Sequence, residues 1–230
     1  MKKLLAIFLF FILSLPGYSI EGGFSNLKQD NNYSCGPVSS ANAVINIINS
    51  NNLNIPLADE TSLIKELARL EKTKTDGTSI KNLCNGIEEY FKIHNIKLNI
   101  SCYGFINVDK KYLTSNEINF STINGQGIIN IGMYKRNDNG VYERKEGHFI
   151  NLVGIDSQNN KLLVTDPYNP SHSIEEFSYV HADKIKVISK SKHESFAPSK
   201  DYYLITTPIN YLENGDTAII NGVIIFNIEK

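Results

Sequence analysis

Residues 29–48 read QDNNYSCGPVSSANAVINII, with a cysteine at the start of an apolar segment and a glutamine six residues before it. Pro37 suits the first turn of a helix, where its missing N–H costs nothing, and Ser34 or Cys35 can act as the N-cap. Apolar side chains then recur at helical spacing: Val38, Ala41, Val44, Ile45 and Ile48. The pattern predicts a helix with one buried face. Cys35 lies at its positive end, where a thiolate is stabilised and the thiol pKa is lowered.

An isolated cysteine is more often a small buried hydrophobe than a nucleophile, so other residues must support a catalytic assignment. Two later segments supply them: residues 147–154 read GHFINLVG and residues 162–167 read LLVTDP. Each reads as a strand, and they carry His148 and Asp166. A nucleophile, a base, an orienting carboxylate and an amide donor for an oxyanion are thus present in a workable order.

Together these residues resemble the papain-like cysteine peptidases, and within them the C39-like branch. That branch shows Gln, five residues, Cys-Gly-Pro, then His on a strand and Asp-Pro ending a later strand. The resemblance spans residues 28–189. It implies that Cys35 attacks, that His148 moves the proton and that Asp166 orients the imidazole. It also implies that the Gln29 amide and the Cys35 N–H bind the oxyanion. Cys35 is expected to be exposed in a cleft.

Other residues compete for these roles. Four further histidines lie in polar surroundings or after a helix, without a strand-borne partner, and are interpreted as surface residues: His94, His172, His181 and His193. Asn151 and Asp156 are weaker alternatives to Asp166. His148 and Asp166 can share one face of an antiparallel pair only if the connection near Ser157 has an odd number of residues, or if one strand carries a bulge.

The rest of the pattern predicts helices first and strands afterwards. A second helix follows Asp59, with its charges on a solvated face, and a third follows residues 76–79. From Lys97 the period changes to two, apart from an ambiguous segment at 109–125 and a short helix at 173–179. Strands are expected at 98–102, 127–136, 147–156, 161–166, 184–189 and 202–207, and a final hairpin at 219–228. The expected fold class is α+β and papain-like, with an N-terminal helical part packed against a C-terminal antiparallel sheet.

Residues 1–19 read as a signal peptide, with Lys2 and Lys3 before an apolar run too short for a comfortable membrane span. Residues 20–230 are expected to form a single domain. The protein is therefore predicted to be exported, periplasmic or extracellular, and bacterial, without a stable membrane span after signal cleavage; an uncleaved anchor is the alternative. The formal net charge of −1 and the lack of a basic patch give no reason to expect nucleic acid.

The two remaining cysteines, Cys84 and Cys102, both fall on inward faces of predicted elements. In an oxidising compartment they could form a disulfide that leaves Cys35 as the odd thiol, or they could remain core thiols; the sequence leaves both open. No Cys-x-x-Cys or His-x-x-x-His spacing and no glycine-rich phosphate loop occurs. No metal and no cofactor is expected.

The predicted function is an exported cysteine peptidase or amidase that hydrolyses a peptide or isopeptide bond in a peptide or protein substrate. Two alternatives stay open. A transglutaminase, deamidase or acyltransferase would use the same residues and the same acyl-thioester. A secreted, non-catalytic binding module could use the same scaffold.

Overall fold

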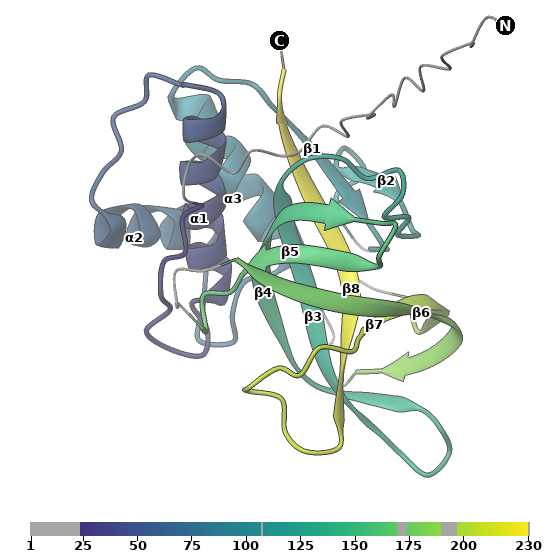
Figure 1. The fold of residues 1–230 in the computed structure, drawn as a ribbon. Helices are drawn as coiled ribbons and strands as arrows, with labels where there is room; N and C mark the ends of the chain where they lie inside the picture. The colour runs from purple at the N-terminus through teal and green to yellow at the C-terminus, as the bar shows by residue number, and fades with distance from the viewer. Residues whose placement is uncertain (1–23, 107, 170–173, 190–196, 230) are drawn as a thin grey trace, which may run out of the picture.

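The computed structural model describes residues 24–106, 108–169, 174–189 and 197–229. In this part of the chain three helices precede eight strands (Figure 1). The helices are α1 (Cys35–Ser50), α2 (Glu60–Leu70) and α3 (Ile80–Ile93). The strands are β1 (Leu98–Tyr103), β2 (Leu113–Ser115), β3 (Gly127–Arg136), β4 (Tyr142–Asp156), β5 (Lys161–Thr165), β6 (Glu175–Ile188), β7 (Ser199–Ile205) and β8 (Asp216–Ile228).

The strands form one sheet in the order β2-β1-β8-β3-β4-β5-β6-β7, and β8 also pairs with β7. This second pairing closes six strands into a barrel, and β1 and β2 extend the sheet beyond it. Neighbouring positions of β3 serve two cores: Ile128 packs in the cluster that includes the helices, and Ile129 in the cluster of the barrel strands. Strands buried on both faces lose the alternation of apolar and polar residues that marks a half-buried strand.

The α1 helix is buried on nearly every side, and its polar side chains bind backbone groups of its neighbours. Asn42 Oδ1 accepts a hydrogen bond from the N–H of Leu27 at 2.8 Å. Ser39 Oγ donates to the carbonyl of Phe149 at 2.8 Å, and Asn151 Nδ2 donates to the carbonyl of Ser39 at 2.8 Å. These bonds satisfy buried polar groups and fix α1 against β4, the strand that carries His148.

The other two helices begin where the sequence predicts. Asp59 caps α2 by accepting from the N–H of Ser62 at 3.1 Å, and Ser79 caps α3 by accepting from the N–H of Asn82 at 3.2 Å. Figure 1 shows the three helices gathered on one side of the barrel. None of the described helices is both long and apolar enough to cross a bilayer.

The predicted fold class is wrong. The described chain is mostly antiparallel sheet that closes into a six-stranded barrel, with three short helices on one side, instead of a helical part packed on an open sheet. Its likeness to a papain-like fold is only loose. The closure depends on Tyr203 pairing with Ile220 and Leu204 with Ile219, contacts between strands that the alternation of residues does not encode.

Two local predictions also fail, and one ambiguous segment is resolved. The helix expected at 173–179 is the start of strand β6, on which Phe177 and Tyr179 are buried. The final hairpin is the single strand β8, and the ambiguous segment at 109–125 contains β2, which pairs in parallel with β1. The predicted signal segment, residues 1–19, lies outside the described residues, so its division from a domain at 20–230 stays a prediction.

Candidate active site

The N-terminus of α1 holds Cys35 as the first helical residue. Ser34 occupies the N-cap position, but its side chain does not accept a hydrogen bond from the first turn; its hydroxyl donates to the carbonyl of Asn31 at 3.1 Å. Of the two residues expected as the N-cap, Ser34 or Cys35, the structure has Ser34 at that position, without a hydrogen bond from its side chain to the first turn. The N–H groups of the first turn therefore have no acceptor on the Ser34 side chain.

A β-bulge sets the register that brings His148 and Asp166 to the same face. Asn151 pairs with Thr165 and Leu152 with Val164, but the register shifts before Gly154 pairs with Leu163. The connection between β4 and β5 has four residues, 157–160, an even number. The bulge therefore restores the shared face, as the register prediction requires.

His148 and Asp166 form a buried pair. His148 Nε2 lies 2.7 Å from Asp166 Oδ1, and the two residues are 4% and 1% exposed. The same Oδ1 accepts from the N–H of Tyr168 at 2.8 Å, and Oδ2 accepts from the hydroxyl of Tyr211 at 2.7 Å. Since Nε2 is engaged with Asp166, Nδ1 is the ring nitrogen left for Cys35, with which His148 interacts.

The three groups shift each other's protonation. Burial raises the pKa of Cys35, but the hydrogen bond and charge of His148 and the N–H groups of Phe149 and Gly36 lower it below its usual value. Burial lowers the pKa of His148, but Asp166 and Cys35 outweigh this and raise it to about 9. Burial likewise opposes the ionisation of Asp166, while His148 and Tyr211 lower its pKa. These interactions stabilise the thiolate of Cys35 and the imidazolium of His148 relative to the same groups free in water.

Cys35 is 7% exposed, so the expectation of an exposed thiol is wrong. A pocket with a volume of about 110 Å³ reaches His148. Its walls are formed by Gln29, Asn32, Met133, Glu146, Gly147, His148, Tyr168 and Tyr211. Cys35 is not part of these walls, and of the two tyrosines Tyr168 is 48% exposed.

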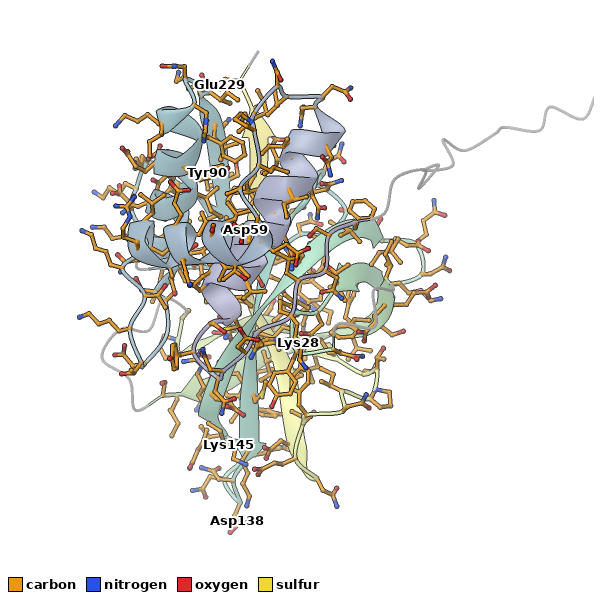
Figure 2. The ribbon with its side chains drawn as sticks, turned by 90° about the vertical axis from the view of Figure 1, so that its left-hand side faces the viewer. Lys28, Asp59, Tyr90, Asp138, Lys145 and Glu229 are labelled. Atoms are coloured by element: carbon orange, nitrogen blue, oxygen red, sulfur yellow. The ribbon has the colours of Figure 1, made fainter. Side chains whose placement is uncertain are left out.

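Gln29 lines this pocket with His148 and is 7% exposed. Its N–H donates to the carbonyl of Pro167 at 3.1 Å, which ties the segment to the turn after Asp166. Its Nε2 donates to the carbonyl of Asn31 at 3.2 Å, while its buried Oε1 has no hydrogen-bond partner. The structure therefore brings Gln29 into the pocket, but its amide is turned toward Asn31. In Figure 2 the neighbouring Lys28 lies below Asp59, which caps α2, and below Tyr90 of α3; Lys145 and Asp138 lie farther down, on the β3–β4 hairpin.

Two aromatic residues in the site were not found from the sequence. The rings of Tyr168 and Tyr211 lie 4.8 Å apart, and their centroids are 6.0 Å and 5.3 Å from that of His148. Tyr168 could have been found, because an aspartate in a turn often accepts the N–H two residues on. Tyr211 lies in the 206–215 loop, and no local pattern marks it.

The competing residues have other contacts. His94 ends α3 and stacks on Tyr90 at 5.0 Å, and Asn151 is engaged with α1. His181 Nδ1 lies 2.9 Å from Asp183 Oδ1 on the surface, and with Asp201 these residues form an exposed group that could supply metal ligands. Asp156 accepts from Asn159 in the β4–β5 turn. His172 and His193 lie outside the described residues.

The sulfurs of Cys84 and Cys102 lie 3.7 Å apart, and both residues are fully buried and unbridged. Hydrogen bonding to Cys102 and burial raise the pKa of Cys84 well above its usual value. Cys35 is therefore the cysteine with an acidified thiol in the described chain, and the other two remain core thiols placed for a disulfide.

Comparisons with known proteins were made with curated sequences, solved structures and family models. No curated protein sequence matches the chain. Among solved structures, the peptidase domain of Streptococcus ComA, a bi-functional ABC transporter involved in a quorum sensing pathway, matches with 15% sequence identity and a TM-score of 0.35. The match covers 78% of this chain and 97% of that domain. The model of the Peptidase_C39 like family matches residues 22–190, most of the sequence, and the chain therefore belongs to the peptidase C39-like family.

Proposed function

We propose that the protein is an exported cysteine peptidase or amidase that hydrolyses a peptide or isopeptide bond with Cys35, His148, Asp166 and Gln29. Membership of a peptidase family supports a peptidase acting on a peptide substrate. One observation carries the assignment. The Cys35 thiol at the start of α1 interacts with His148, and His148 Nε2 lies 2.7 Å from Asp166 Oδ1. This order of groups is what a thiol nucleophile with an oriented base requires.

In the first half of the reaction, the Cys35 thiolate attacks the carbonyl carbon of the scissile bond. The carbonyl oxygen becomes an oxyanion, and the N–H of Cys35 at the helix N-terminus and the amide of Gln29 stabilise it. For this step Gln29 Nε2 turns from the Asn31 carbonyl toward the substrate. His148 then donates its Nδ1 proton to the leaving amine as the C–N bond breaks, and an acyl-thioester remains.

In the second half, neutral His148 takes a proton from water, and the hydroxide oxygen attacks the thioester carbon. Loss of the Cys35 sulfur releases the carboxylic acid and returns the thiolate and imidazolium. Asp166 accepts from His148 Nε2 in both halves, which fixes the tautomer and stabilises the positive ring. Its second oxygen is held by Tyr211, so the carboxylate keeps its orientation.

Export is part of the proposal and rests on the sequence of residues 1–19, with a basic start, an apolar run and small residues at the end. A protein carrying this signal and residues 20–230 as one domain would act in the periplasm or outside the cell. N-terminal sequencing of the protein recovered from a bacterial culture tests this: a mature start near residue 20 supports export, and an intact Met1 in the cytoplasmic fraction contradicts it.

The experiment that tests the activity is a cleavage profile. The protein and its Cys35→Ala variant are each incubated with a diverse peptide mixture, and the products are identified by mass spectrometry. Cleavage by the wild type alone supports hydrolysis. Amine incorporation or ammonia release without chain cleavage would instead assign a transferase or deamidase. Identical product spectra for both proteins would remove the peptidase assignment and favour a binding module.

A further inference from the structure

A second carboxyl group, that of Glu71, lies next to the first turn of α1, the helix that begins with the candidate nucleophile Cys35. Glu71 is the C-cap residue of α2, and its N–H donates a hydrogen bond to the carbonyl of Leu67 at 2.8 Å. The charges of α2 are predicted to lie on a solvated face, but the Glu71 side chain is fully buried. A buried glutamate without a basic neighbour is rare in proteins, and it needs an explanation.

Two glycines leave the space that this side chain occupies. A Cβ on Gly86 of α3 would stand 2.4 Å from Glu71 Cγ, too close for any side chain. A Cβ on Gly36 of α1 would stand 2.7 Å from Thr78 Oγ1 and 3.5 Å from Glu71 Oε2. The carboxyl group therefore lies against the first turn of α1, at the residue that follows Cys35.

The surroundings of Glu71 favour its neutral form. The titratable groups that face it are Cys35 from α1 and Cys84 from α3, both of which can only add negative charge. The hydroxyls of Ser40 and Thr78 are the nearest donors, but neither carboxyl oxygen forms a hydrogen bond of normal geometry, and Thr78 is already bound to Thr73 at 2.7 Å. Within the described residues no lysine, arginine or histidine forms an ion pair with Glu71.

Resting on the function proposed above, we propose that Glu71 is a positioning residue for Cys35 that supports the first turn of α1 as a neutral carboxylic acid and opposes the thiolate once it ionises. When Glu71 loses its proton to solvent, a like charge lies close to the sulfur. The imidazolium of His148 then returns its proton to Cys35, which leaves a neutral thiol and a neutral imidazole.

The pH at which this happens follows from burial. Burial and, to a smaller extent, the negative charge of Cys35 raise the pKa of Glu71 to about 8. The hydroxyls of Ser40 and Thr78 act in the opposite direction and lower it. The pKa of His148 is about 9. As the pH rises, ionisation of Glu71 therefore acts against the thiolate in addition to the loss of the imidazolium proton. Glu71 thus weakens the reactive ion pair on the alkaline side, where His148 also loses its proton.

The test uses the rate at which iodoacetamide alkylates Cys35, which needs no substrate. The full chain, Glu71→Gln and the control Glu60→Gln are compared at pH 6 and pH 9; the control removes a carboxylate from the exposed start of α2. We expect equal rates at pH 6 and a rate about fivefold or more higher in Glu71→Gln at pH 9, because a nearby charge shifts a thiol pKa by about one unit. Glu60→Gln should follow the wild type at both values.

A Glu71→Gln rate that follows the wild type at both pH values overturns the proposal and leaves the proposed function intact. A wild-type rate that does not depend on His148 defeats the proposed function instead, so the two failures are distinguishable. If Glu71→Gln does not fold, carbon-13 carboxyl titration of the wild-type protein decides. A carboxyl carbon with a midpoint near 8 supports the neutral Glu71, and the absence of any midpoint above 7 overturns it.

Discussion

His148 Nε2 lies 2.7 Å from Asp166 Oδ1, and this contact determines which ring nitrogen can serve Cys35. With Nε2 held by the carboxylate, Nδ1 is the ring nitrogen left for the thiol, and both Asp166 and Cys35 stabilise the positive charge of the ring. The pair is nearly inaccessible to water, so its charges are poorly screened. The mechanism and the pH dependence of the proposed peptidase both follow from this geometry.

Replacement of Asp166 by Asn should move the alkaline limit of activity to lower pH. The amide oxygen can still accept from His148 Nε2, but the negative charge that raises the His148 pKa to about 9 is gone. The His148 imidazolium supports activity below its pKa in the folded protein and is lost as the pH rises through that pKa. A lower His148 pKa therefore removes the imidazolium at a lower pH. The pH profile of kcat/KM should lose its alkaline limb at least about one pH unit sooner. An unchanged limb would mean that Asp166 does not stabilise the ring.

Replacement of Tyr211 by Phe should weaken catalysis without changing the pocket's shape. The change removes the hydroxyl that donates to Asp166 Oδ2 at 2.7 Å and leaves a buried carboxylate oxygen unpaired. We expect kcat to fall about tenfold and the free energy of unfolding to fall by about 1–3 kcal/mol. Tyr203→Phe is the matched control, because its hydroxyl donates to the Ile118 carbonyl instead. Equal kinetics for both variants would exclude Tyr211 from the site.

Replacement of Gln29 by Ala should leave folding nearly intact and lower kcat by roughly 100- to 1000-fold, the usual effect of losing one oxyanion donor. The rate of Cys35 alkylation should not change, because no oxyanion forms in that reaction. Asn32→Ala, which alters the same pocket wall, should keep most of the activity. Undiminished turnover of Gln29→Ala would remove this residue from the site.

Cys84 and Cys102 should form a disulfide under oxidising conditions, since their sulfurs lie 3.7 Å apart. Closing a loop of this length should raise the free energy of unfolding by about 3 kcal/mol. Peptide mapping after mild oxidation, without reductant, would find the two peptides joined. Joined peptides that include Cys35, or two thiols that stay free in the exported protein, would contradict the prediction.

The sequence pairs His148 with Asp166, which the structure brings into contact, but it predicts the wrong fold class, and the reason is physical. Cys35, His148 and Asp166 belong to local patterns, a helix start and two strand segments, and the parity of side chains on paired strands restricts how they can meet. The barrel closes through pairing of β7 with β8 and of β8 with β3, which depends on contacts between distant segments. Local periodicity contains no information on these contacts.

The errors at individual residues have similar causes. The segment before Tyr179 carries two glutamates and resembles a helix by propensity, but its burial on the barrel makes it a strand. Tyr211 reaches Asp166 from a loop without regular structure, and Glu71 follows a helix whose pattern predicts solvated charges. In each case tertiary packing decides the position of the side chain.

The most direct test of an activated nucleophile is selective alkylation. The folded protein is treated with iodoacetamide at pH 5 to 6, well below the free-thiol pKa of about 8.5, and the labelled peptides are mapped by mass spectrometry. Cys35 is nearly buried, so its absolute rate is limited by access, but Cys84 and Cys102 are fully buried, and the pKa of Cys84 is raised by its hydrogen bond to Cys102 and by burial. We predict labelling at Cys35 alone and a marked fall in its rate in His148→Ala, because the ion-pair partner is gone. Equal labelling of all three cysteines, or a Cys35 rate unaffected by His148→Ala, would contradict the account.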